Sequence, residues 1–259
     1  MNILIISKLL PHPLGISGSI IIYNRIRNLV ERGHAVSLLS FIRPEEEPYV
    51  RDIRDLVSGL QLFPAPEAAS AWQRLARLWA STIPSPFRED YAPDFGRLAG
   101  EMVERTKANV AVAEFSSMGQ YLYRNPHLPA VRRIVSCHEC CTQAYANVIR
   151  FHRWSPSGLK KRIGIRSVRR YEFAMYRNMD RILVLTPQQR YILLNHAPNL
   201  RVSVVPHGVD IAHYAPAPMA DREISLLFVG YFFNESNRDA VHWFTRTVWP
   251  RLRESHPAI

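Results

Sequence analysis

The residues best suited to chemistry in this sequence lie where apolar runs end. Glu114 follows the run Val-Ala-Val-Ala, and His138 and Glu139 follow Ile-Val-Ser-Cys. Carboxylates and imidazoles at such positions can bind a substrate and exchange protons with it. Because parallel strands present their carboxyl ends at one edge of a sheet, we expect these side chains to face one cleft. A structural histidine held by a backbone hydrogen bond is the alternative for His138.

The loop after the first apolar run is a candidate phosphate site. It holds two glycines, Gly15 and Gly18, and a helix is predicted to begin directly after them. Glycine lets a ligand approach the backbone, and the N–H groups at a helix N-terminus attract an anion. Ser17 and Ser19 are candidate caps of that helix. The alternative is a flexible turn that binds nothing.

A second turn, His207-Gly208-Val209-Asp210, comes shortly before a stretch rich in proline and alanine. Gly208 permits unusual backbone torsions, and the Asp210 carboxylate can bond the local backbone. We count His207, Gly208 and Asp210 as binding candidates. The alternative is a structural turn that docks two domains.

Three cysteines, Cys137, Cys140 and Cys141, lie beside His138. They form no disulfide framework and are typical of a reducing cytosol, so we expect a cytoplasmic protein. Zinc binding and a cysteine nucleophile are the alternatives, and the cramped spacing without a second Cys-x-x-Cys pair disfavours zinc. We therefore expect neither a metal nor a cofactor.

The elements that must position these residues alternate between strands and helices. Amphipathic spacing predicts a first helix from Ser19 to Arg32, with Gly33 as its left-handed end. Apolar runs predict strands over NILIIS, AVSLLSF, LQLFP, NVAVAEF, RRIVSCHE, RILVLT and RVSVVP. Further helices are predicted over AWQRLARLWAS, Phe95–Lys107 and Gly158–Met179, and from Pro187 onward. This alternation predicts an α/β fold with a doubly wound parallel sheet, a Rossmann-like domain.

A composition break divides the chain. Residues 215–223 are rich in proline and alanine and predict a linker between a first domain over 1–214 and a second over 224–259. The run ISLLFVG predicts a buried strand ending at Gly230, and a helix follows it. A Rossmann domain needs on the order of 150 residues. We therefore expect the second domain to be incomplete.

Composition and motifs disfavour several functions. No run reaches the roughly 18 apolar residues of a membrane-spanning helix. The glycine loop is not Gly-x-Gly-x-x-Gly, and the second strand ends in Ser40-Phe41 rather than an acidic residue, which disfavours dinucleotide binding. The net charge of +11 favours an anionic partner. Because no recognition motif accompanies that charge, we expect no specific nucleic acid.

Two amphipathic stretches favour peripheral contact with an anionic membrane, at its inner face. The first places Trp and Leu on one helical face beside arginines: Trp72, Leu75, Leu78 and Trp79, with Arg74 and Arg77. The second is a basic cluster of Lys160, Lys161, Arg162, Arg166, Arg169 and Arg170. Aromatic and cationic faces suit a bilayer interface. The alternative is that the Trp face packs in the core and the charges are solvated.

The order of these motifs resembles that of retaining glycosyltransferases of family 4. The matching motifs are PLGISGS, RGHAVSLLSF, SCHE, RILVLTPQQ, VVPHGVDIAHYAP and LLFVGYFFNESNRDAVHWF, and they cover the whole chain. The most specific part is VVPHGVDIAHYAP followed by a linker and LLFVG. The resemblance implies the GT-B architecture of two Rossmann domains, here the N-terminal half with a truncated second domain.

The resemblance also implies roles. The first domain would hold a glycan or lipid-linked acceptor and the second a nucleotide-diphosphate sugar, with transfer across the cleft, retention and no metal. His138 is similar to the family's cleft histidine, and the glycine loop would leave room for the donor diphosphate or the acceptor. The start of the donor domain is matched by Gly230, Asn237 and Asp239. Such an enzyme would serve the synthesis of a surface polysaccharide or glycolipid.

The chain departs from the family on the donor side. Tyr231 and Phe232 follow Gly230 where the family has Arg and Lys, and Arg238 is the nearest cation. The family's acidic Glu-x7-Glu donor motif is absent. We therefore expect the 259-residue chain to be a fragment that transfers no sugar by itself. The alternative is a non-catalytic Rossmann-like binding module that docks an anionic membrane or a partner.

Overall fold

The computed structural model describes residues 1–15, 18–66, 83–151, 154–209, 211, 225–230, 232 and 235–257. The chain divides into two compact units, Met1–His207 and Gly208–Ile259. The first unit contains a parallel sheet with its helices. The described part of the second contains helix and irregular chain.

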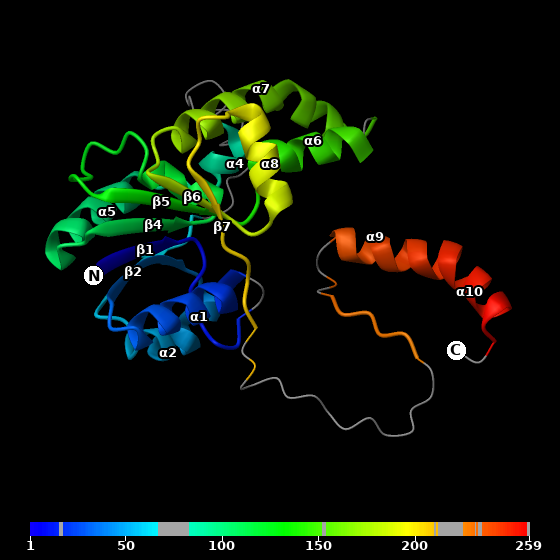
Figure 1. Cartoon of the computed structure of the whole chain (residues 1–259), viewed down its shortest axis with the longest axis horizontal. Coiled ribbons are helices and arrows are strands. Elements are labelled where there is room, and N and C mark those ends of the chain that lie inside the picture. Colours follow the sequence, from blue (N-terminus) through cyan, green and yellow to red (C-terminus); the bar gives the residue numbers. More distant parts are fainter. Residues whose placement is uncertain are drawn as a thin grey trace. The chain divides into compact units, whose positions relative to one another are not determined.

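The first unit is built on a seven-stranded sheet in which every neighbouring pair is parallel (Figure 1). Its strands are β1 (Asn2–Ser7), β2 (Ala35–Ile42), β3 (Gly59–Pro64), β4 (Val110–Glu114), β5 (Arg132–Cys137), β6 (Arg181–Val184) and β7 (Val202–Val204). Each overlaps a run predicted from the sequence, and β2 and β3 each extend one residue beyond theirs. The Rossmann-like parallel sheet is therefore confirmed.

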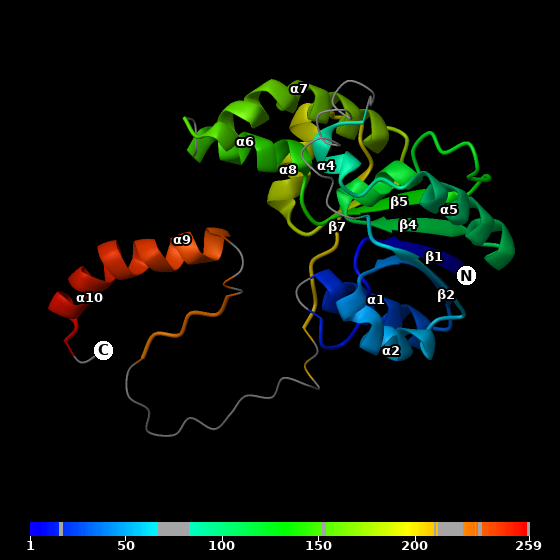
Figure 2. The same cartoon turned by 180° about the vertical axis from the view of Figure 1, so that it is seen from behind.

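Helices cover both faces of this sheet (Figures 1 and 2). One face carries α1 (Gly18–Glu31) and α2 (Val50–Arg54), preceded by the 3₁₀ helix η1 (Pro44–Tyr49). The other carries α4 (Ser85–Arg88), α5 (Pro93–Thr106), the 3₁₀ helix η2 (Ser116–Tyr121) and α7 (Pro156–Tyr176). The described residues of this unit also form α6 (Cys141–Phe151) and α8 (Pro187–His196).

The predicted helices agree with α1, α5, α7 and α8, and Gly33 ends α1 with a φ of +78° as expected. The short helices α2 and α4 were not predicted, and neither was α6. The predicted helix AWQRLARLWAS lies outside the described residues. The apolar face predicted around Trp72 therefore stays a prediction.

The order of the strands, β3-β2-β1-β4-β5-β6-β7, reverses between β1 and β4. The chain adds strands on one side of β1 and then crosses to the other side. At such a switch point the connections diverge and leave a crevice at the carboxyl ends of the strands. Ser7 and Glu114 end the two strands that flank it.

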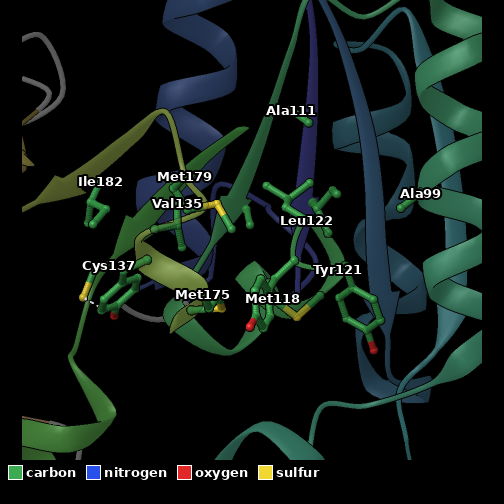
Figure 3. Packing of buried hydrophobic residues seen from close by; sticks show 14 of the residues in the cluster. Ala99, Ala111, Met118, Tyr121, Leu122, Val135, Cys137, Met175, Met179 and Ile182 are labelled. Carbon is green, nitrogen blue, oxygen red and sulfur yellow. Dashed lines mark hydrogen bonds between the residues drawn. The ribbon is translucent and has the colours of Figure 1, made fainter. Parts of the chain in front are cut away.

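The loop after β4, which contains the 3₁₀ helix η2, packs against α7. Figure 3 shows Met118 and Leu122 of this loop among the buried side chains that cover the sheet, with Met175 of α7 close by. A Cβ added at Gly119 would lie 2.9 Å from the Met175 sulfur. The absence of a side chain at Gly119 lets the loop pack tightly against α7, and this holds the residues that follow Glu114 in place.

The second unit contains α9 (Glu235–Trp243), a π-helical turn (Phe244–Val248) and α10 (Trp249–Ser255). They occupy the predicted C-terminal helix. The predicted buried strand is wrong for residues 225–230, which form no strand and leave Leu227 87% and Val229 85% exposed. A strand needs neighbours for its backbone hydrogen bonds, and the described part of this unit offers none. A truncated Rossmann domain is thus not seen there.

None of the helices in the described ranges combines the length and apolar character needed to span a bilayer. The whole of the predicted linker, residues 215–223, lies outside those ranges.

Candidate functional site

Two predicted site residues, Glu114 and His138, meet at the carboxyl ends of neighbouring strands. Glu114 ends β4 and pairs in register with Ser136 of β5, two residues before His138. His138 Nε2 lies 2.9 Å from Glu114 Oε2. Arg25 Nη1 of α1 donates to Glu114 Oε1, and also to Ser136 Oγ at 2.9 Å. Both oxygens of the carboxylate are therefore engaged.

The pair is withdrawn from solvent. The Glu114 side chain is fully buried and the His138 side chain is 10% exposed. Burial by itself would raise the pKa of Glu114, but the hydrogen bond with His138 and the charge of Arg25 outweigh it, and the pKa lies below its usual value. An ionised carboxylate can only accept, so His138 Nε2 carries the proton and Nδ1 is the acceptor of the neutral ring. Glu114 therefore orients His138.

The ring of His138 stacks on Phe115, with centroids 4.3 Å apart and planes inclined by 29°. Lys8 Nζ lies 4.8 Å from the centroid of the Phe115 ring and 3.7 Å from Asp90 Oδ2. Phe115 has a φ of +73°, a conformation that non-glycine residues rarely adopt. Its backbone N–H donates to the Ser136 carbonyl at 2.9 Å, which holds the strained backbone in place.

His207, at the end of the first unit, is the third predicted residue at this site. Its ring centroid lies 5.7 Å from that of His138. Partial burial lowers the pKa of His207, and its interactions with His138 and Arg25 lower it further. A neutral His207 ring avoids placing another positive charge near Arg25. Gly208 is exposed with open space around it, and Asp210 lies outside the described residues.

The glycine loop is filled by the protein's own atoms at both glycines. A Cβ at Gly18 would lie 2.5 Å from Phe115 Cζ, and one at Gly15 would lie 2.4 Å from Ser19 Oγ. Ser19 Oγ donates to the Leu10 carbonyl and accepts from the His12 N–H, so it closes the loop. The protein's own atoms therefore explain why these two positions carry glycine. Ser17, the other candidate cap, lies outside the described residues.

The turn that carries His138 is tied to α8. Gln189 Nε2 donates to the His138 carbonyl at 3.1 Å. The same side chain accepts from the Leu185 N–H at 2.8 Å and forms a capping box with Thr186. Glu139 has an exposed side chain, and its carbonyl accepts from Ser116 Oγ at 2.9 Å. The backbone on both sides of the His138 ring is therefore anchored.

Glu172, a fully buried carboxylate of α7, caps the N-terminus of α6. It accepts from the N–H groups of Cys141 and Thr142, each at 2.8 Å, and from the Thr142 hydroxyl at 2.6 Å. It also accepts from the Tyr176 hydroxyl at 2.9 Å. An acidic group at a helix N-terminus satisfies free N–H groups and the helix dipole. This cap fixes α6 three residues after His138.

The cysteines are packing residues: Cys137 and Cys140 are buried, and Cys141 is partly buried. Burial raises the pKa of the Cys137 thiol to about 12, and also raises the pKa of Cys140 and Cys141. A thiol that stays protonated is a poor nucleophile and a poor metal ligand. Within the described ranges no group of three His, Cys, Asp or Glu residues could hold a metal ion.

The predicted donor-side residues lie in the second unit. A Cβ at Gly230 would lie 2.6 Å from Phe228 Cε1 and 3.3 Å from Asn237 Nδ2, so Gly230 and Asn237 are neighbours there. Asp239 is exposed on α9.

Sequence reasoning missed the supporting residues of this site. Arg25 lies on an amphipathic helix, where a cation usually faces solvent, yet it borders the buried stripe of Ile22 and Ile26, and its side chain is only 19% exposed. A cation next to an apolar stripe was the one available signal. The sequence holds no signal for Phe115 or Gln189, because their contacts depend on how β4, β5 and α8 come together.

A cavity of about 740 Å³ lies elsewhere, between α5 and α7. Tyrosines line it together with two arginines: Tyr91, Tyr121, Tyr123 and Tyr171, with Arg124 and Arg170. None of the predicted site residues lines this cavity.

A family model described as Glycosyltransferase Family 4 matches residues 18–213. Among solved structures, a sucrose-phosphate synthase from Thermosynechococcus elongatus has a TM-score of 0.56 at 12% identity, covering 84% of this chain and 51% of that chain. A UGT transferase from Siraitia grosvenorii in complex with UDP has a TM-score of 0.45 at 13% identity, covering 80% and 51%. The chain therefore spans about half the length of these relatives. A comparison with curated proteins gives no match.

Proposed function

The chain belongs to glycosyltransferase family 4, and on that basis we propose that it carries the acceptor-side half of a retaining glycosyltransferase. The sugar passes from a nucleotide-diphosphate sugar to a glycan or lipid-linked acceptor, and its anomeric configuration is kept. The product belongs to a surface polysaccharide or glycolipid.

The observation that carries this proposal is the orientation of His138. Its Nε2 is held by Glu114, which is held in turn by Arg25, at the edge of the sheet where ligands bind in such folds. The remaining nitrogen, Nδ1, accepts from a sugar hydroxyl when the ring is neutral and donates to an anionic oxygen when it is protonated. His138 then positions the sugar at the reacting bond, because a ring fixed on one edge presents the other in one direction.

Cations and a helix N-terminus support a diphosphate at this edge. Lys8 lies over the Phe115 ring, Arg25 bonds the Glu114 that holds His138, and α1 begins close by at Gly18. Since Phe115 and Ser19 fill the space at Gly18 and Gly15, a phosphate would meet the first turn of α1 rather than the space over the glycines.

The proposed domains are an acceptor-side domain over 1–214, a linker over 215–223 and a donor-side segment over 224–259 that carries Gly230, Asn237 and Asp239. We infer that this chain alone transfers no sugar. The exposure of residues 225–230 supports that inference, because a donor must be held from both sides of the cleft.

The test is a transfer assay with radiolabelled nucleotide sugars and lipid or glycan acceptors, on the chain alone and on a version that carries a complete donor-binding domain. We expect product with the donor's anomeric configuration from the second protein only. Inversion of configuration, or no transfer by a folded protein that binds its donor, would contradict the proposal.

A non-catalytic binding module is the second candidate, and the exposed basic side chains of α7, among them Lys160, Arg162 and Arg166, favour it. A binding module would retain acceptor or membrane binding and show no donor binding even with a complete second domain. Calorimetry with nucleotide-diphosphate sugars separates the two candidates.

A further inference from the structure

The helices α6 and α7 form a hairpin that extends outward beyond the sheet (Figures 1 and 2). α6 begins three residues after His138, and α7 returns from Pro156. With a rise of 1.5 Å per residue, the 11 residues of α6 span roughly 16 Å. The far end of the hairpin therefore lies about that distance from the start of α6 at the candidate site.

This far end, which we call the hairpin tip, presents apolar side chains to solvent. Phe151 is 70% exposed and Trp154 is 85% exposed. In the first turns of α7, Leu159 is 59% and Ile163 is 80% exposed, and their spacing of four places both on one helix face. Single exposed apolar residues are ordinary, but four at one end of a hairpin form a patch that marks an interaction site.

Basic side chains surround the tip. Arg166 and Arg170 continue the face of Leu159 and Ile163 along α7, and both are exposed. The other described Lys and Arg residues of the hairpin are Arg150, Lys160, Lys161, Arg162 and Arg169. From residue 140 to residue 171 the sequence contains no Asp or Glu. The hairpin therefore has an apolar end, and α7 carries basic residues without an acidic one as far as Tyr171.

Capping hydrogen bonds stabilise the start of α7 near the tip and the start of α6 at the base. At the tip, the Ser155 hydroxyl accepts from the Gly158 N–H at 3.0 Å, and Pro156 occupies the first turn of α7. At the base, Glu172 caps α6. A preformed surface loses little conformational entropy on binding.

We propose that the hairpin tip docks on an anionic lipid bilayer, with the apolar side chains in the interface and the basic side chains against lipid phosphates. An acidic protein surface or a nucleic-acid duplex would satisfy the charges, but neither offers an apolar environment to the exposed Trp, Phe and Ile side chains. A bilayer satisfies both, because aromatic side chains favour its interface and cations favour its anionic headgroups.

Docking in this way holds the candidate site near the membrane, within reach of an acceptor carried by a lipid. The proposal thus deepens the proposed function by naming a membrane-borne acceptor. Its test measures binding alone, so a failure of docking and a failure of sugar transfer are separate results.

The experiment is co-sedimentation of the 259-residue chain with vesicles of phosphatidylcholine alone or mixed with phosphatidylglycerol. We expect binding to the anionic vesicles, weakened by salt. Replacing Lys160, Arg162 and Arg166 together with Gln should lower the partition coefficient on the order of 100-fold. The matched control, Arg32, Arg51 and Arg54 replaced with Gln on the α1–α2 side of the unit, carries the same charge change and should bind as the parent does.

A second pair of variants tests the apolar part. The double substitution Phe151→Ser and Trp154→Ser should lower binding roughly 10-fold or more, since it removes the side chains that enter the interface. Tyr191→Ser, on α8, also removes an exposed aromatic ring (65% exposed) and should leave binding unchanged. All changed positions are exposed, and circular dichroism checks that each variant is folded.

Three results would overturn the proposal. The first is no vesicle binding, or equal and salt-insensitive binding to neutral and anionic vesicles. The second is an equal loss in the hairpin variants and their controls. The third is binding of double-stranded DNA or RNA through the same basic residues without vesicle binding, which would make the hairpin a nucleic-acid surface.

Discussion

Glu114 and His138 belong to neighbouring strand ends and share a hydrogen bond of 2.9 Å between Oε2 and Nε2. The other oxygen of the same carboxylate receives Arg25 from α1. A fully buried carboxylate is tolerated only when it is paired and hydrogen-bonded. The same contacts that stabilise Glu114 therefore fix the orientation of the His138 ring.

Substitution of His138 tests its role in the cleft. In a version of the protein with a complete donor-binding domain, His138→Ala should lower sugar-transfer turnover by about 10²-fold or more, because a positioned polar group is lost. The melting temperature should change little. His127→Ala, which removes an exposed histidine elsewhere in the unit, is the control and should keep full turnover. A large fall in melting temperature with turnover per folded molecule intact would identify His138 as a structural residue.

Replacing Glu114 with Gln should change the tautomer of His138. The amide can donate to Nε2, so the ring proton moves to Nδ1, and Arg25 loses its partner charge. We expect a stability loss of about 2 kcal/mol in urea unfolding. The ¹⁵N chemical shifts of the His138 imidazole report the tautomer directly. Unchanged shifts would show that Glu114 does not set the proton position.

The lowered pKa of Glu114 predicts how stability depends on pH. A carboxylate whose pKa is lower in the folded than in the unfolded protein stabilises the fold fully above the unfolded value. That stabilisation is lost as the pH falls below the ordinary value of 4.5 and through the folded-state pKa. Urea midpoints measured across this acid range should fall more steeply in the parent than in Glu114→Gln. Parallel curves would contradict the assignment.

Two glycine substitutions separate packing from backbone strain. Gly18→Ala places a Cβ against the Phe115 ring and should cost about 1–3 kcal/mol. It should also shift the ring-proton resonances of His138, since Phe115 stacks on that ring. Gly33→Ala has open space but a positive φ, so it should cost about 1–2 kcal/mol of strain and leave His138 unaffected. Equal effects on the His138 spectrum would refute the Gly18–Phe115–His138 connection.

Loss of the Glu172 cap should loosen α6. Glu172→Ala leaves the N–H groups of Cys141 and Thr142 without their acceptor and should lower the free energy of unfolding by about 3 kcal/mol. Hydrogen exchange should accelerate in α6 more than in β1. Glu104→Ala, at an exposed position of α5, is the matched control and should change neither quantity.

How much of this architecture could be predicted depended on whether the signal was local. The strands were predictable because each is an apolar run, and α5 and α7 because their apolar residues recur at helical spacing. Gly33 was predictable as a helix end because only a left-handed residue fits there. The buried strand predicted at residues 224–230 failed for 225–230, because a strand depends on neighbours that an apolar run does not reveal.

The sequence by itself determined the alternation of strands and helices, the strand ends that carry Glu114 and His138, and the resemblance to a family. Periodicity and apolar runs are properties of consecutive residues, so they can be read along the chain. The tertiary structure decided that both oxygens of Glu114 are occupied, that Arg25 is a partner of the site, and that Phe115 fills the space at Gly18. These contacts join residues that lie between 24 positions (Glu114 and His138) and 97 positions (Gly18 and Phe115) apart, and they exist only because strand order brings β1, β4 and β5 together.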